Sequence, residues 1–135
     1  MLYRMPLTEI VYYRDDDGTV PVLEWLAELA RKNRKAAEKC AVRLETLRQM
    51  GHELRRPIAD YLRDGIYELR VRQGNVQCRL LYFFHGQECV VLAHGLTKET
   101  DVPDTDIERA LERSRRFAAD PERHTHQEEA DEEDE

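Results

Sequence analysis

Alternating β-branched and aromatic residues predict three consecutive strands in the middle of the chain, at residues 66–72, 76–84 and 88–94. Two short segments that contain glycine separate them, residues 74–75 and residues 85–87. Strands joined by loops this short pair with their neighbours in antiparallel fashion. The centre of the chain is therefore expected to be a β-meander.

The first of these loops predicts which side chains face one another. If Gly74 and Asn75 form a two-residue turn, Arg70 lies directly opposite Arg79 on one face of the sheet. Like charges in this position destabilise a sheet unless an anion lies between them. Glu68 is a nearby residue that can supply that anion.

The second loop leaves the alignment of the last strand open. If Gly86 and Gln87 form the turn, Arg79 also faces His94, and a row of three polar side chains crosses the sheet. A shift of this turn by one residue breaks the row, because each such shift moves every side chain to the other face.

The segments around the meander show one further strand and the spacing of amphipathic helices. A strand is expected over residues 8–14, followed by a helix over residues 21–30 with Pro21 in its first turn. Asn33 is expected to cap a second helix, which ends at Met50 and Gly51. A last helix is expected to begin at Asp104 or Thr105. Together these elements predict an α+β fold, with the first strand added at one edge of the antiparallel three-stranded meander, two N-terminal helices packed on the sheet and a C-terminal helix.

Residues 52–64, between the second helix and the meander, are expected to form a loop that carries Arg55, Arg56 and Arg63. If this loop folds over the sheet, its arginines meet any ligand bound there. In the alternative interpretation, apolar residues such as Leu54 only anchor a solvated connection. The spacing of the residues does not decide between the two.

The length of 135 residues and the hydrophobic share of 41% suit one domain, which we expect over residues 1–120, followed by a disordered acidic tail over residues 121–135. The sequence has no apolar run of membrane-spanning length and no signal peptide at its start, so a cytoplasmic protein without membrane contact is expected. Its three cysteines, without paired spacing, are expected to be buried free thiols.

Charge is distributed unevenly along the chain. The net charge is −7, but the last eight residues contain seven acids, and residues 31–79 carry 13 Lys and Arg against 6 Asp and Glu. A basic centre suits a polyanion such as RNA, although helices rich in Lys and Arg also serve only as solvated surfaces. The sequence contains no P-loop, dinucleotide-binding glycine motif, Ser-His-Asp motif or cluster of metal ligands, so a metabolic enzyme is the least supported class.

Four short segments carry a resemblance to a known family. They are Leu-Arg-Arg-Pro at residues 54–57, Asp-Gly-Ile-Tyr-Glu-Leu-Arg at residues 64–70, Arg-Leu-Leu-Tyr-Phe-Phe at residues 79–84 and His-Gly-Leu-Thr-Lys at residues 94–98. With the order of the expected elements, they closely resemble the phage-derived branch of the RelE/HigB-like toxin family. The resemblance covers about residues 8–118.

The resemblance implies a RelE-like fold and a toxin of a type II toxin–antitoxin system that binds the ribosome and cuts mRNA. It implies no cofactor and no metal, and a cognate antitoxin that usually carries a helix-turn-helix domain. The arginines of the family's two central strands correspond to Arg70 and Arg79, and its basic residue after the last strand corresponds to Lys98.

The chemistry of metal-free RNA cleavage suits these residues. The ribose 2′-hydroxyl attacks the adjacent phosphorus, so the site needs a proton acceptor, a proton donor and cations that stabilise the phosphorane-like transition state. Arg70 and Arg79 suit the last task, because guanidinium groups bind phosphate oxygens in pairs. Lys98 adds charge or donates a proton. His94 titrates near neutrality and is either catalytic or a structural residue of its strand.

Four further arginines, Arg55, Arg56, Arg63 and Arg72, are expected to bind mRNA or ribosomal RNA, whereas Tyr67 and Tyr82 are expected in the core. Acidic residues follow Lys98 where many relatives carry basic ones, namely Glu99, Asp101, Asp104 and Asp106. These acids repel phosphate. They keep open the alternative of a catalytically degenerate RelE-fold protein that acts only by binding protein or RNA.

Overall fold

The computed structural model describes residues 7–98 and 100–128. In chain order, its elements are β1 (Glu9–Tyr13), α1 (Pro21–Lys32), α2 (Arg34–Met50), the short 3₁₀ helix η1 (Gly51–Glu53), β2 (Ala59–Arg63), β3 (Ile66–Gln73), β4 (Val76–Phe84), β5 (Cys89–Thr97), α3 (Asp104–Ala119) and β6 (Thr125–His126).

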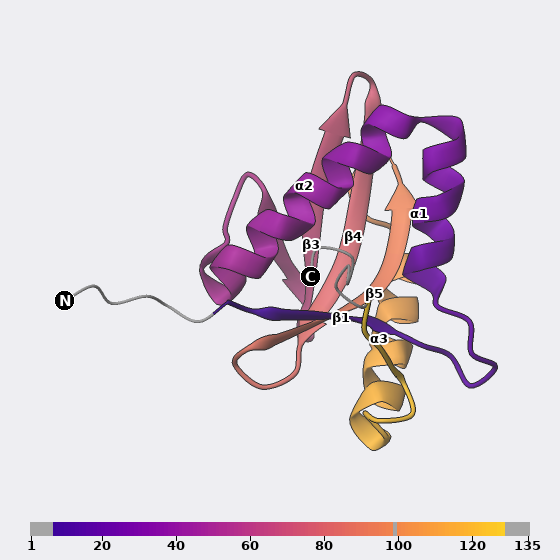
Figure 1. Cartoon of the computed structure of the whole chain (residues 1–135). Helices are drawn as coiled ribbons and strands as arrows, with labels where there is room; N and C mark the ends of the chain where they lie inside the picture. Colours follow the sequence, from indigo (N-terminus) through magenta and orange to yellow (C-terminus); the bar gives the residue numbers. More distant parts are fainter. Residues whose placement is uncertain (1–6, 99, 129–135) are drawn as a thin grey trace, which may run out of the picture.

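The strands form one mixed sheet in the order β2-β3-β4-β5-β1-β6. Strands β2 to β5 are antiparallel neighbours, β1 lies parallel to β5, and β6 pairs with the other side of β1. Helices α1 and α2 cover one face of the sheet, and α3 packs on the other (Figure 1). The predicted α+β fold is confirmed, including the meander and the position of the first strand beside it.

Each face of the sheet has its own apolar core. The core under α1 and α2 includes Leu47, Leu69, Leu80 and Leu92, all fully buried. The core under α3 joins Leu81 and its neighbours on β3, β4 and β5 to the apolar side of that helix. Cys40 and Cys78 are buried free thiols, as expected, and Cys89 is partly exposed.

The ends of α2 are built as the sequence indicates. The Asn33 side chain caps the helix by accepting a hydrogen bond from the backbone N–H of Ala36 at 3.0 Å. At the other end, Gly51 adopts a φ of +51° and packs directly against the Thr8 side chain. A side chain at this position would strain the backbone, because φ is positive, and would also clash with Thr8.

The segment expected to be a loop contains a strand. Residues Ala59–Arg63 form β2, in which Ala59 pairs with Leu69 and Tyr61 with Tyr67 on β3. The turn between the two strands is Asp64-Gly65, and both residues have positive φ, +53° and +87°. Asp-Gly is a strong signal for a hairpin turn, so this strand was recognisable from the sequence.

The observed register of β5 on β4 differs from the one that would place His94 opposite Arg79. Phe84 pairs with Val90, and a β-bulge near Ala93 shifts the register further, so Arg79 faces Leu96 and His94 faces Leu81. Compared with the register that a Gly86-Gln87 turn would give, β5 is displaced by two residues along β4 at this point. His94 therefore stays on the same face as Arg79 but lies diagonally from it, so of the two alignments that the sequence left open, the one that pairs them is excluded.

Part of the expected tail packs on the domain. Residues Thr125–His126 form β6, and the buried ring of His124 stacks on Tyr13, with ring centroids 5.3 Å apart. Its Nδ1 lies 2.7 Å from the carbonyl oxygen of Arg14. Residues 129–135 lie outside the described part of the chain. Within residues 7–98 and 100–128, no helix has the length and apolar character needed to span a bilayer.

Close packing between α1 and β5 generates a stability prediction. A Cβ atom on Gly95 would lie 2.5 Å from Cδ2 of the Trp25 ring, so Gly95→Ala is expected to lower the free energy of unfolding by about 1–3 kcal/mol. Urea unfolding, followed by the fluorescence of Trp25, measures the change. Thr97→Ala, at an exposed position of the same strand, is the control and should change stability by only about 0.5 kcal/mol. Equal stability of the Gly95→Ala variant and the wild type would contradict this packing.

Candidate functional site

Helix α3 covers only part of its face of the sheet. Its apolar contacts lie over Ile66, Leu81, Phe83 and their neighbours. Further along β3 and β4, towards the Gly74-Asn75 turn, the same face carries charged side chains instead of apolar ones. This uncovered part of the sheet is the candidate site.

Arg70 and Arg79 are directly opposite one another in the β3–β4 ladder, which confirms the alignment predicted from the turn. Glu68 lies between them: its Oε2 is 2.9 Å from Arg70 Nη2, and its Oε1 is 2.9 Å from Arg79 Nε. The carboxylate thus offsets the repulsion that two like charges would otherwise produce at this position.

The line of charges continues onto the edge strand. Asp60 on β2 lies 3.5 Å from Arg70 Nη2, and its other neighbour is Arg56, whose Nε donates a hydrogen bond to Asp60 Oδ2 at 2.9 Å. Cations and anions alternate along this line. We call the five side chains the charge ladder: Arg56, Asp60, Arg70, Glu68 and Arg79.

Exposure of the ladder decides which of its members an external phosphate can reach. Glu68 and Arg79 form its floor, with 5% and 11% of their side chains exposed, whereas Arg70 is 38% exposed and Arg56 is 75% exposed. Glu68 Oε1 and Arg79 Nε have no hydrogen bond within the described chain. Charge, rather than an aligned hydrogen bond, therefore holds these two atoms together.

Lys98 and Arg72 lie at the rim of the same region. Lys98 follows the end of β5, and its backbone N–H donates to the Gln77 carbonyl at 2.9 Å. Its exposed side chain borders a depression that Gln77 also lines. The Gln77 side chain reaches back to Arg79 Nη1 at 3.5 Å. Arg72, exposed on β3, donates to the carbonyl of Gly74 in the hairpin turn at 3.3 Å.

His94 faces α3 and is held on both sides. Its Nε2 lies 2.6 Å from Asp106 Oδ1, and its Nδ1 lies 3.4 Å from Arg113 Nη1, which also donates to the Ala93 carbonyl at 2.6 Å. Because a guanidinium can only donate, Nδ1 accepts and the ring proton lies on Nε2. Burial lowers the pKa of His94, Asp106 raises it, and the charges of Arg113 and Arg109 lower it, so that the pKa lies below its usual value. The ring is thus a neutral link between β5 and α3.

The arginines expected to bind RNA are not gathered in one place. Arg63 contacts Asp64, Asp104 and Glu108 at 2.7–2.9 Å and so ties β2 to the first turns of α3. Arg55 donates to backbone carbonyls beside it, and only Arg56 belongs to the charge ladder. Sequence reasoning missed Asp60. Its position beside Arg70 follows only once β2 is recognised as a strand.

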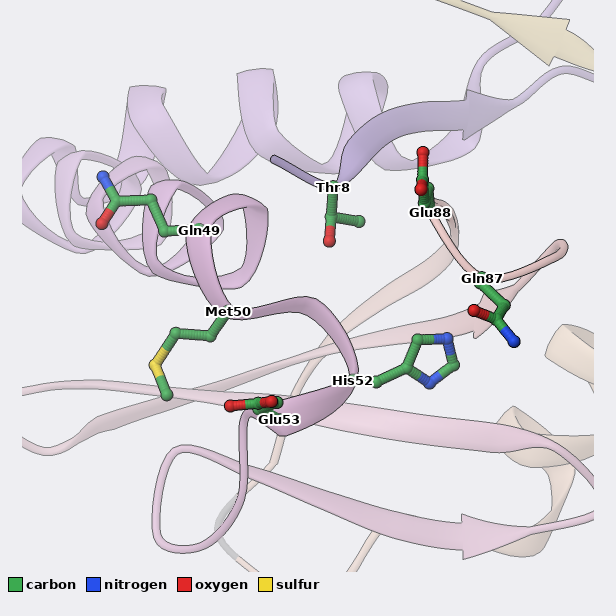
Figure 2. Close-up of a pocket in the computed structure, with 7 residues that line it drawn as sticks. All are labelled: Thr8, Gln49, Met50, His52, Glu53, Gln87 and Glu88. Atoms are coloured by element: carbon green, nitrogen blue, oxygen red, sulfur yellow. The ribbon is translucent and has the colours of Figure 1, made fainter. Parts of the chain in front are cut away.

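Away from the charge ladder, a hollow of about 430 Å³ lies between the start of β1, η1 and the β4–β5 loop. Figure 2 shows the His52 ring pointing towards Gln87 across it, and this ring stacks on Phe84 with centroids 3.6 Å apart. Glu53 and Glu88 also line the hollow, and no Lys or Arg does. It is therefore poorly suited to bind phosphate. No three His, Cys, Asp or Glu side chains of residues 7–98 and 100–128 are grouped to hold a metal ion.

The ladder predicts a large stability effect at Glu68. Glu68→Gln removes the charge that compensates the nearly buried Arg79 and is expected to lower the free energy of unfolding by about 3 kcal/mol. Asp60→Asn is the matched control, because its partners are more exposed, and should cost less than about 1 kcal/mol. Urea denaturation measures both. Losses of similar size would show that the buried end of the ladder is no more important than the exposed end.

The neutral His94 predicts a pH effect of definite sign. An unfolded histidine takes up a proton below about pH 6.5, whereas His94 in the folded protein resists protonation, so stability falls as pH drops below that value. The slope is at most about 1.4 kcal/mol per pH unit. His94→Gln keeps a donor for Asp106 but cannot titrate. Its unfolding free energy, measured from about pH 7 to pH 5, should fall less steeply than that of the wild type; parallel curves would contradict a neutral His94.

Comparison of the sequence with known proteins identifies its family. Residues 24–115 match the family described as Phage derived protein Gp49-like (DUF891), a stretch that runs from α1 into α3 and contains the whole charge ladder. No protein of curated function matches the sequence closely. Because the match covers more than half of the chain, the protein belongs to this Gp49-like, phage-derived family of RelE/HigB-like toxins.

Proposed function

We propose that the protein is the toxin of a type II toxin–antitoxin system and that it cuts mRNA on the ribosome without a metal ion. The observation that carries this proposal is the pair of guanidinium groups, Arg70 and Arg79, held side by side by Glu68 on the uncovered part of the sheet. Membership of a family of RelE/HigB-like toxins supports it.

The proposed reaction is an internal transfer within the RNA. The ribose 2′-oxygen loses its proton to a base and bonds to the adjacent phosphorus, while the bond from phosphorus to the 5′-oxygen breaks and that oxygen receives a proton. The products are a 2′,3′-cyclic phosphate and a 5′-hydroxyl. Negative charge increases on the non-bridging oxygens as the phosphorane forms, so fixed cations stabilise the transition state more than the substrate.

Arg70 and Arg79 supply those cations in this proposal. Arg70 is exposed enough to bind a phosphate oxygen directly, and Arg79 adds positive charge from the floor of the site. Glu68 keeps both side chains in place before the RNA arrives, which limits the rearrangement needed during the reaction. It also competes with the phosphate for the two guanidinium groups, so binding must come largely from contacts outside the ladder.

Lys98 and His94 are the candidates for proton transfer and added charge. Lys98 lies exposed at the rim, directly after β5, the strand that pairs with the strand of Arg79, and suits the donor to the leaving 5′-oxygen. His94 has both ring nitrogens engaged by Asp106 and Arg113. A catalytic His94 therefore requires one of these contacts to open when the RNA binds.

The remaining basic residues suit contacts with mRNA and ribosomal RNA. Arg55, Arg56 and Arg72 are exposed beside or near the ladder, and we assign them to backbone phosphates, which basic side chains bind without regard to sequence. Arg63 contributes by holding α3 in place. The protein acts in the cytoplasm, where translated mRNA is found, and a cognate antitoxin with a helix-turn-helix domain neutralises it.

A second candidate function is binding without catalysis. It is favoured by the two carboxylates of the ladder, because Glu68 and Asp60 already neutralise much of the charge of Arg70 and Arg79. In that case, the fold would act only through contacts with protein or RNA.

Controlled expression in bacteria tests the two functions. The wild type should arrest growth and produce cuts in translated mRNA that keep a constant phase relative to the codons, as read from mapped 5′ ends. Arg70→Ala and Arg79→Ala should each slow cleavage by about 100-fold or more, the effect of losing one group that stabilises developing charge. Arg115→Ala, at an exposed position on α3, should cleave like the wild type.

The amount of soluble protein must be equal for each variant, since Arg79 is nearly buried. Arg70→Lys separates charge from shape: a single ammonium cannot bind two phosphate oxygens as a guanidinium does, so partial activity is expected. Wild-type protein that accumulates in soluble form without arrest and without cuts would reject the nuclease and leave the binding function.

A further inference from the structure

A groove of about 480 Å³ runs along the edge strand β2. It is lined by Leu54, Arg55, Arg56, Ala59, Asp60, Tyr61 and Tyr67. Its volume falls within the range of roughly 300–1,000 Å³ that is typical of sites for small ligands. Nothing in the cleavage mechanism proposed above uses its aromatic residues.

Tyr61 is an exposed aromatic ring that is fixed in position. Its side chain lies at the sheet edge with 53% of the residue exposed. The hydroxyl accepts a hydrogen bond from the backbone N–H of Gly65 at 3.0 Å, and the ring meets Tyr67 edge-on, with centroids 5.0 Å apart. A flat ring that is held before the ligand arrives can stack on another flat ring with little loss of conformational entropy.

Behind Tyr61, a packed series of rings supports this position. Tyr67 stacks on Tyr82, with centroids 5.4 Å apart, and meets Phe84 edge-on. Tyr82 is fully buried. The exposed ring is therefore the outermost member of a cluster that is anchored in the core under α1 and α2.

A cation lies in the wall of the same groove. The Arg56 side chain is 75% exposed, and the hydrogen bond from its Nε to Asp60 orients the guanidinium. Its two terminal nitrogens make no hydrogen bond to another residue within the described chain. They are able to bind a phosphate that approaches from solvent.

We propose that this groove binds one unpaired nucleotide of the RNA substrate, with its base stacked on Tyr61 and its phosphate on Arg56. An exposed aromatic ring beside an arginine is the combination by which proteins hold single-stranded RNA. Asp60 and Tyr61 follow one another on β2 and so lie on opposite faces of the sheet, and Arg56 contacts Asp60 at this edge. A strand that leaves the groove therefore turns around the edge strand at Arg56 to reach Arg70, which also contacts Asp60. The groove thus holds the RNA next to the site of cleavage. This inference rests on the proposed function for the choice of RNA, but its test does not require cleavage.

Binding of a single-stranded RNA that cannot be cut tests the inference. The probe is a fluorescein-labelled octanucleotide in which every ribose is 2′-O-methylated, which removes the attacking hydroxyl. Its affinity for the full-length protein is measured by fluorescence anisotropy over a series of salt concentrations. Tyr61→Ala should weaken binding by about 5- to 100-fold, the effect of losing one stacked base. Tyr61→Phe retains the ring and should bind within about 3-fold of the wild type.

Arg56→Ala has a different signature. Loss of one phosphate contact should make the slope of the logarithm of affinity against the logarithm of salt concentration shallower by about 0.7, whereas Tyr61→Ala should leave that slope unchanged. Val42→Ala, at an exposed apolar position on α2, is the control and should bind like the wild type. A 4-thiouridine in the same probe should cross-link to the peptide that contains Tyr61.

Three results would overturn the inference: wild-type protein that does not bind the probe, Tyr61→Ala that binds it as tightly as the wild type, or a cross-link confined to other peptides. If RNA binding is unchanged but Tyr61→Ala loses its affinity for the antitoxin, the groove is a protein interface instead. None of these results bears on whether the wild type cleaves mRNA, which the expression experiment above tests. Conversely, the groove can bind the probe in a protein that does not cleave, so the two proposals fail separately.

Discussion

The carboxylate of Glu68 lies between two guanidinium groups that the β3–β4 register brings face to face. The two-residue turn at Gly74-Asn75 fixes that register, and a slip of either strand by one residue would turn its arginine towards the apolar core under α1 and α2. Because the pair is close to the interior, removal of one charge leaves the others uncompensated. The same contacts that stabilise the hairpin therefore position the groups we assign to phosphate binding.

The two faces of the sheet are covered in different ways. Helices α1 and α2 provide a continuous apolar cover, which includes the close contact of Trp25 with Gly95. On the other face, polar contacts hold α3 over only part of the sheet: Arg63 contacts its first turns, and His94 is bonded to Asp106 and Arg113. This arrangement leaves the charge ladder uncovered. The ladder then continues around β2 to a groove of different chemistry, with an exposed aromatic ring.

Local patterns in the sequence predicted most of the fold. Short glycine-containing turns identified the meander and the opposition of Arg70 and Arg79, and helix-capping residues placed the helix ends close to their observed positions. The Asp64-Gly65 turn also carries a hairpin signal, but the spacing of residues 52–64 predicts a loop, so β2, the position of Asp60 and the groove beside Tyr61 do not follow from that spacing. The β4–β5 loop and the bulge near Ala93 each shift the register by one residue, and together they place His94 opposite Leu81 instead of Arg79. Contacts between distant segments, such as Arg63 with Asp104, depend on the packing of α3 and could not be read from spacing.

The chemical nature of the cut ends tests the central claim most directly. A purified translation reaction would receive wild-type protein and, in parallel, the Arg70→Ala variant, and the ends of the mRNA fragments would be determined by enzymatic labelling and mass spectrometry. Attack by the 2′-hydroxyl, stabilised by the two arginines, predicts 5′-hydroxyl ends and 2′,3′-cyclic phosphate ends with the wild type and almost none with the variant. Fragments with 5′-phosphate and 3′-hydroxyl ends, or equal cleavage by both proteins, would contradict the account.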